Sequence, residues 1–140
     1  MKRKQILWLI LCSFCLLFSA CSSNQEENNI LEEIRSAPVV KLEFAEQQSD
    51  EPIFADNTVP TETFADLRIQ TSDDEWDEEW IYRFTYNPKE KVINGHEIIV
   101  QIGLTSASIN GVVYIPEEDV DDSAILEWAE GVYKRVVGEI

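Results

Sequence analysis

The stretch EIIVQIGL, Glu97 to Leu104, carries the clearest structural pattern in the chain. Its residues alternate as in a half-buried strand, with an apolar face made of Ile98, Val100, Ile102 and Leu104. Asn94-Gly95 precedes this stretch and Asn110-Gly111 follows it, and Asn-Gly supplies the positive φ angles of two-residue hairpin turns. The second pair separates short strands expected at residues 106–109 and 112–115. We therefore predict an antiparallel meander.

Three earlier segments are also predicted strands because their residues alternate: residues 39–45, 64–71 and 80–86. Their expected buried faces carry Val40, Leu42 and Phe44; Leu67 and Ile69; and Trp80, Tyr82, Phe84 and Tyr86. Residues 47–60 are polar and acidic and include two prolines. We expect a long loop there, with Ile53-Phe54 folded back onto the core.

The last pattern in the chain is helical. Asp121, Asp122 and Ser123 can cap a helix and suit its positive end, and Lys134 and Arg135 suit its last turns. Between them, apolar side chains recur at helical spacing: Ile125, Trp128, Ala129, Val132, Tyr133, Val136 and Val137. A helix and a sheet that each have one apolar face cover each other. The sequence predicts one two-layer α+β domain over residues 37–140, with Trp128 buried against the sheet.

The first residues have the organisation of an export signal. Lys2, Arg3 and Lys4 precede an apolar run over residues 6–18. This run is shorter than the roughly 20 residues of a membrane-spanning helix, and it has the length of a signal-peptide core. It leads into Ser19-Ala20-Cys21, and polar residues follow at once.

This arrangement resembles the lipobox of bacterial lipoproteins, with Ser19 and Ala20 as the small residues before the modified cysteine. The resemblance covers residues 1–21 only. It implies that residues 1–20 are removed as a signal peptide after Ala20. It also implies that the Cys21 thiol receives a diacylglycerol, which anchors the protein to a membrane outside the cytoplasm, at the cell surface or in the periplasm.

Cysteine usage agrees with this interpretation. Cys12 and Cys15 lie in the expected signal peptide, so Cys21 is the single thiol that the mature chain would keep. One cysteine cannot form an internal disulfide, although exported compartments often permit one. Two acyl chains on Cys21 would anchor the protein stably, where a single chain is marginal.

The charge of the chain limits its partners. The full sequence has 11 Lys and Arg against 27 Asp and Glu, a formal net charge of −16. Loss of Lys2, Arg3 and Lys4 with the signal peptide leaves 8 cations and all 27 acidic residues, a net charge of −19. Such a charge argues against nucleic acid and anionic lipid as partners, and it favours basic proteins, basic peptides or divalent cations. It also serves simply to keep a tethered domain soluble.

Residues 21–36 form the expected link between the lipid and the domain. Residues 22–29 are polar and lack aliphatic side chains, as a flexible tether does. Ile30, Leu31 and Ile34 then recur at near-helical spacing. We predict a lipidated polar tether that contains one short helix and ends before Ala37-Pro38, because the residue before proline disfavours helical geometry.

An acidic run is the most unusual local feature, and it consists of Asp73, Asp74, Glu75, Trp76, Asp77, Glu78 and Glu79. Its carboxylates and indole can attract a basic partner through charge and cation–π contact. Calcium also binds carboxylate oxygens, but the run lacks the glycine and the ligand spacing of an EF-hand loop. The plainer alternative is a solvated connection in which Trp76 packs locally.

Catalytic signatures are missing from the sequence. His96 is the single histidine, follows a predicted turn, and has no G-x-S-x-G motif to serve. One histidine and one lipidated cysteine cannot form a zinc site, and no glycine-rich phosphate loop is present. We therefore expect no enzyme activity, no metal and no cofactor.

The leading hypothesis is a lipid-anchored module that presents an acidic face to a basic protein or peptide. The alternatives are an accessory domain that responds to divalent cations, an uncharacterised surface hydrolase, and a peptide signal cut from the discarded leader.

Overall fold

The computed structural model describes residues 29–47, 51–56 and 62–138. The chain divides into two compact units, Met1–Glu32 and Glu33–Ile140, and the fold below is that of the second. The expected signal peptide, Cys21 and residues 22–28 of the polar tether lie outside the described residues. The short helix expected near Ile34 is present over residues 29–36. Among the described residues, no helix combines the length and the apolarity needed to cross a membrane.

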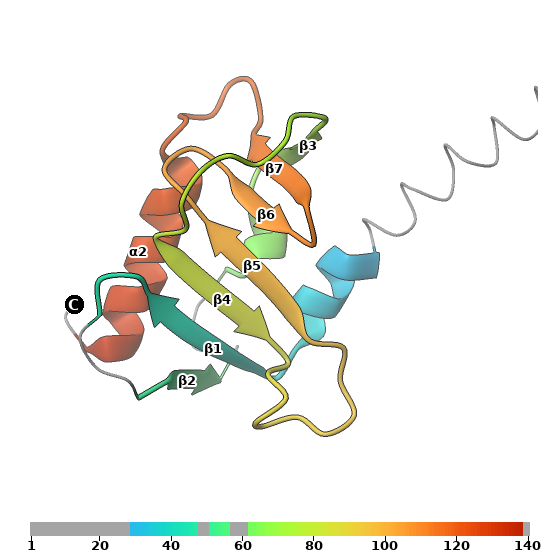
Figure 1. Cartoon of the computed structure of the whole chain (residues 1–140), viewed down its shortest axis with the longest axis vertical. Coiled ribbons are helices and arrows are strands. Elements are labelled where there is room, and N and C mark those ends of the chain that lie inside the picture. Colours follow the sequence, from blue (N-terminus) through green and yellow to red (C-terminus); the bar gives the residue numbers. More distant parts are fainter. Residues whose placement is uncertain (1–28, 48–50, 57–61, 139–140) are drawn as a thin grey trace, which may run out of the picture. The chain divides into compact units, whose positions relative to one another are not determined.

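Seven strands form one antiparallel sheet in the order β2-β1-β4-β5-β6-β7-β3 (Figure 1). The strands are β1 Val39–Phe44, β2 Ile53–Asp56, β3 Ile69–Ser72, β4 Tyr82–Tyr86, β5 Ile98–Ile102, β6 Ala107–Ile109 and β7 Val112–Pro116. The predicted meander is confirmed as β4 to β7. The chain crosses the whole sheet between β2 and β3, which are consecutive strands at opposite edges, and it returns from β3 to β4 in the interior of the sheet.

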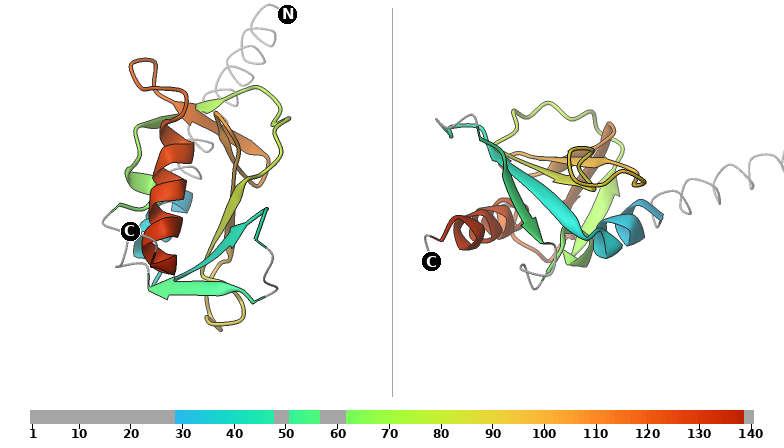
Figure 2. Two further views of the ribbon diagram at one scale, coloured as in Figure 1. Left: turned by 90° about the vertical axis from the view of Figure 1, so that its left-hand side faces the viewer. Right: turned by 90° about the horizontal axis from the view of Figure 1, so that it is seen from below.

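Helix α2, Ala124–Val137, covers one face of the sheet, here called the inner face (Figure 2). The helix ends at Gly138, which adopts a left-handed φ of 80°. Its apolar side chains pack on the sheet, and Tyr133 lies 5.4 Å from Tyr82 between ring centroids. Trp128 lies against the sheet as predicted, with 5.3 Å between its ring centroid and that of Phe84, but it is half-buried where the prediction was a buried side chain. The α+β class and the two layers are confirmed.

Alternation along the strands produces the core. The inner face includes the buried side chains of Val40, Leu42, Tyr82, Phe84, Tyr86, Ile98, Val100, Ile102, Ala107, Ile109 and Tyr114. The opposite, outer face carries polar pairs, of which Arg83 and Glu43 form the best defined, with Nε–Oε2 and Nη2–Oε1 distances of 2.8 and 3.0 Å. The hydrogen bond from Arg83 lowers the pKa of Glu43.

One of the two predicted Asn-Gly turns is confirmed. Asn110 and Gly111 have φ angles of 52° and 84° and join β6 to β7 directly. Asn94-Gly95 is not a two-residue turn, because β4 ends at Tyr86 and β5 begins at Ile98. The whole of residues 87–97 connects these strands, and the positive φ falls on Asn87, at 53°.

Four further expectations are corrected. The loop predicted over residues 47–60 contains edge strand β2, in which Ile53, Phe54 and Ala55 are apolar and which pairs with β1. The strand predicted over residues 64–71 is a 3-10 helix, Phe64–Asp66, followed by the shorter β3. Leu104, predicted on the buried face of the strand, lies beyond the end of β5 and is 62% exposed. Trp80 lies before β4 and stacks on Arg83, with 4.4 Å between the guanidinium carbon and the ring centroid.

Candidate functional site

The acidic run connects β3 to β4 across the outer face of the sheet (Figure 2). It has no regular secondary structure over residues 73–80. The run passes beside Val113 and Ile115 of β7, whose neighbour Tyr114 points to the inner face and meets Phe64. A charged segment is therefore placed on the side of the sheet that α2 leaves open.

Two side chains of the run anchor it to the turn between β5 and β6. The indole Nε1 of Trp76 donates to the Ser106 hydroxyl at 3.0 Å. The Glu78 carboxylate accepts from the Thr105 amide at 3.0 Å and from the Thr105 hydroxyl at 3.2 Å, and also from the Ser106 hydroxyl. Gly103 permits this approach, because a Cβ there would lie 2.9 Å from the Cβ of Glu78.

The other five side chains of the run are exposed carboxylates: Asp73, Asp74, Glu75, Asp77 and Glu79. Asp74 accepts a hydrogen bond from the Ser72 hydroxyl at 3.2 Å. Within the described part of the chain, none of the five forms an ion pair with a cation. The run thus holds two side chains inward and presents five negative charges to solvent.

A hollow of about 270 Å³ lies between the run and the sheet. Trp76, Val113 and Ile115 give it apolar walls, and hydroxyl and carboxylate groups complete its lining, from Ser72, Asp74, Glu75, Asp77, Glu78, Thr105 and Ser106. Such a lining suits a group that combines an apolar stem with a positive charge. Among the described residues, no three His, Cys, Asp or Glu side chains converge as metal ligands.

The sequence predicts one surface made of all seven residues of the run, whereas the structure separates them into anchors and exposed charges. Spacing within the run could not reveal this, because the partners of Trp76 and Glu78 lie in the turn at Thr105 and Ser106. His96, which the sequence places after a turn, is exposed, and its Nδ1 lies 2.9 Å from Oε2 of Glu33.

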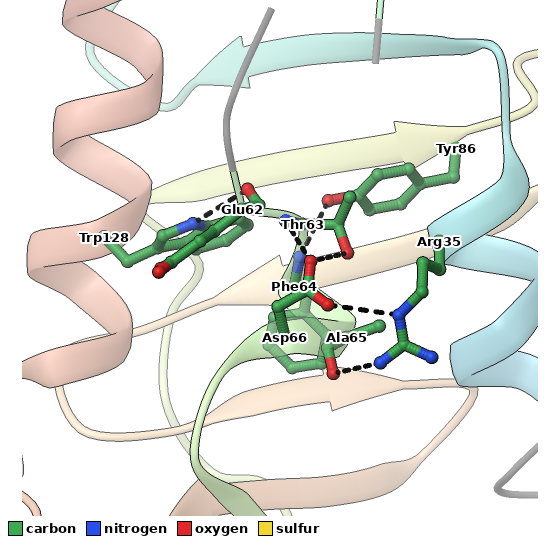
Figure 3. Close-up of polar contacts among 8 residues, drawn as sticks. All are labelled: Arg35, Glu62, Thr63, Phe64, Ala65, Asp66, Tyr86 and Trp128. Carbon is green, nitrogen blue, oxygen red and sulfur yellow. Dashed lines mark hydrogen bonds and ion pairs between the residues drawn. The ribbon is translucent and has the colours of Figure 1, made fainter. Parts of the chain in front are cut away.

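A second polar cluster surrounds the 3-10 helix on the inner side of the sheet (Figure 3). The Asp66 carboxylate accepts from the Thr63 amide at 2.9 Å, the Thr63 hydroxyl at 3.0 Å and Arg35 Nε at 3.1 Å. These contacts, the Thr63 amide first, lower the pKa of Asp66. Arg35 also donates to the Ala65 carbonyl at 3.1 Å.

Buried aromatic groups complete this second cluster. The Phe64 amide points to the Tyr86 hydroxyl at 3.4 Å, and burial raises the pKa of that hydroxyl. Trp128 Nε1 donates to the Glu62 carbonyl at 3.3 Å. Because Phe64 is 0% exposed and Tyr86 2% exposed, the cluster is a structural brace of the core.

The described domain is thus an antiparallel sheet with a helix on its inner face and an anchored acidic run on its outer face. Comparison of the chain with protein-family models, with curated proteins and with solved structures returned no match. The residues and their geometry therefore carry the functional proposal.

Proposed function

We propose that this protein is a lipid-anchored interaction module of the bacterial cell envelope, in which the acidic run binds a basic protein or peptide. The anchor is supported by the cationic start, the apolar core and Ser19-Ala20-Cys21. The mature charge of −19 favours a cationic partner.

The observation that carries the binding proposal is that some side chains of the run hold its backbone in place while the others are exposed. Trp76 and Glu78 fix the backbone to the turn at Thr105 and Ser106, and the five exposed carboxylates share no described ion pair. A segment that is already fixed loses little conformational freedom when it binds. Unpaired charges of one sign also speed the encounter with an oppositely charged surface.

The hollow beside Trp76 suggests how one basic side chain would be received. Lys and Arg have aliphatic stems and cationic heads. The stem would lie along Val113 and Ile115, while the head would meet the carboxylates and the indole face.

The anchor is tested by Cys21→Ala in the full chain. We expect the variant to lose metabolic labelling with palmitate and to move to a soluble or unprocessed fraction, since it has no thiol at the lipobox. Unchanged labelling would contradict the anchor.

Partner binding is tested by in vivo cross-linking of the full chain. In one variant, Asp73, Asp74, Glu75, Asp77 and Glu79 become Asn or Gln, while Trp76 and Glu78 keep the run in place. The matched control neutralises five exposed carboxylates elsewhere: Glu46, Glu62, Glu118, Asp121 and Asp122. We expect the parent and the control to cross-link a basic partner, which dissociates with salt, and the run variant to lose it.

Two results would contradict the binding proposal. Equal capture by both variants would place the interface elsewhere. Stabilisation by millimolar calcium chloride beyond that of sodium chloride at equal ionic strength, lost only in the run variant, would instead indicate an ion site.

A further inference from the structure

The loop between β4 and β5, residues 87–97, differs in character from the rest of this acidic protein. It carries Lys89 and Lys91. Ile93, two residues before Gly95, is 95% exposed. Its one central acid, Glu90, is paired with Lys41 at 2.9 Å. An apolar tip flanked by cations is thus present on a chain whose mature charge is −19.

Hydrogen bonds within the loop fix its backbone in the conformation that exposes Ile93. The amides of Lys91 and Val92 both donate to the Pro88 carbonyl at 3.0 Å. At the base of the loop, Asn87 Nδ2 donates to the His96 carbonyl at 3.4 Å. Val92 lies against Gly95, where a Cβ would come within 2.8 Å of it. Val92 therefore packs within the loop, and its neighbour Ile93 points away.

Further contacts involve the two lysines of the loop, through the backbone of Lys89 and the side chain of Lys91. The Lys89 amide donates to the Glu97 carboxylate at 2.9 Å, and the Lys91 ammonium lies 4.9 Å from the ring centroid of Phe54. Both lysines lie within four residues of Ile93, on the same loop. A tip of this kind, with an apolar side chain and adjacent cations, matches the acyl boundary and the phosphates of a lipid surface.

The position of the loop in the fold favours, as its partner, the same bilayer that would hold the lipid on Cys21. Glu33 is the first residue of the compact domain, and it contacts His96 of this loop at 2.9 Å. Because residues 29–33 are helical, the segment from Cys21 to Glu33 can span at most about 34 Å. The loop therefore adjoins the point where the tether enters the domain.

The acidic run is anchored at the other end of the same strand. The loop leads into β5 at Ile98, whereas Trp76 and Glu78 are bonded to the turn that follows Ile102 (Figure 1). A strand of five residues separates these points by about 17 Å. The cations and the acidic run are thus segregated to opposite ends of β5.

We propose that the 87–97 loop is a second membrane contact, in which Ile93 enters the interface of the bilayer and Lys89 and Lys91 meet lipid phosphates. This inference rests on the proposed lipid anchor at Cys21. The contact fixes the orientation of the tethered domain and directs the acidic run away from the anionic surface, where a partner can reach it. Repulsion between the run and the membrane favours the same orientation.

The test uses the full, mature lipidated protein in vesicles of phosphatidylethanolamine with phosphatidylglycerol. Ile93→Cys and the control Leu104→Cys each introduce one thiol for a nitroxide label, because Cys21 carries the lipid. Leu104 is a suitable control because it is 62% exposed and follows the opposite end of β5. Collision of each label with oxygen, which concentrates in the bilayer, is compared with collision with a water-soluble nickel chelate.

We expect the label at residue 93 to gain oxygen collisions and lose nickel collisions several-fold relative to the label at residue 104. Lys89→Gln with Lys91→Gln should reduce this shift, as should vesicles of phosphatidylcholine alone. A label at residue 93 that is as accessible to nickel as the control would overturn the contact. So would a label that stays aqueous on vesicles and becomes immobile only in native membranes, which would assign the loop to a protein.

Mass spectrometry of the mature N-terminus and vesicle flotation distinguish this failure from failure of the proposed function. Protein that carries diacylglycerol on Cys21 and floats, but whose residue 93 stays in water, overturns the second contact alone. Protein without diacylglycerol overturns both.

Discussion

The two segments that adjoin β3 are both fixed by a carboxylate that accepts several hydrogen bonds, but they lie on opposite faces of the sheet. Residues 63–66 precede β3 and cover the inner face, whereas the acidic run follows it and crosses the outer face. In each, one carboxylate accepts three hydrogen bonds: Asp66 from Thr63 and Arg35, and Glu78 from Thr105 and Ser106.

The two segments differ in what the fixed backbone carries. Residues 63–66 insert Phe64, which is 0% exposed, into the core. The acidic run carries five carboxylates in solvent and one half-buried indole. Hydrogen bonds to a carboxylate can thus fix an irregular segment in either setting, and burial of apolar surface decides how much the segment adds to stability. The outer segment is fixed without being required by the core.

The largest expected difference is between Phe64→Ala and Trp76→Ala. Removal of a buried Phe costs about 3–5 kcal/mol because it leaves a cavity. Trp76 is half-buried, and its hollow already opens to solvent, so we expect less than half that cost. Urea unfolding of the chain from Ser22 onward, followed by circular dichroism, measures both. An equal or greater loss for Trp76→Ala would make the run part of the core.

A smaller effect is expected within the run itself, from Glu78→Ala against Glu79→Ala. Loss of hydrogen bonds to a charged acceptor should cost about 1–3 kcal/mol, since the Thr105 amide and two hydroxyl groups lose their partner. Glu79 is exposed, and its removal should change stability by about 0.5 kcal/mol or less. The same urea titration measures both variants. If the two substitutions prove equal, the turn at Thr105 does not anchor the run.

The core was predictable from the sequence, whereas residues 64–66 were wrongly predicted as strand and the anchors within the acidic run were not predicted. The alternation at Ile98, Val100 and Ile102 reports burial directly, and Asn110-Gly111 reports its own backbone angles, so the meander and the helix were predictable. Phe64 belonged to a segment that also alternated, but its backbone folds to bring the Thr63 amide to Asp66. That preference depends on Arg35 and Tyr86, which are distant in sequence.

The candidate site was predictable only in composition. Seven consecutive residues identified the acidic run, but nothing local distinguishes Glu78 from Glu79. The distinction arises from Gly103 and the hydroxyl groups of the β5–β6 turn, which meet Glu78 only after the chain has crossed the sheet.

Acid should weaken the inner segment through Asp66. Its pKa lies below the ordinary value of 3.8 because the Thr63 amide and Arg35 favour the charged form. A lowered pKa contributes stability that is fully present above pH 3.8 and is lost as pH falls through the folded-state value. Since the side chain is 35% exposed, solvent screens the Arg35 pair and we expect Asp66→Asn to cost only about 1 kcal/mol at pH 7.

Parallel urea titrations of the parent and Asp66→Asn from pH 7 to acid check this prediction. The gap between the two proteins should narrow as pH falls below 3.8, because protonation removes the charge that the variant lacks. A gap that stays constant with pH would show that the asparagine fails for steric reasons and not through the lost charge.

The smallest stability effect is expected from the exposed charges of the run. Changing Asp73, Asp74, Glu75, Asp77 and Glu79 to Asn or Gln removes repulsion between neighbours without touching Trp76 or Glu78. We expect a gain of less than about 1 kcal/mol at low ionic strength, which sodium chloride should reduce because it screens the repulsion in the parent.

The control defined above, in which Glu46, Glu62, Glu118, Asp121 and Asp122 are neutralised, spreads the same change of charge over three segments and so separates local from global repulsion. Both variants remove the same charge, but like charges within a few ångströms repel more strongly than scattered ones. The run variant should therefore gain more than the control in low salt, and the two should converge in high salt. Equal gains would mean that net charge alone matters and that the run stores no local repulsion for a basic partner to relieve. A loss in the run variant would mean that the five carboxylates also hold the segment, which would remove the distinction between anchors and exposed charges.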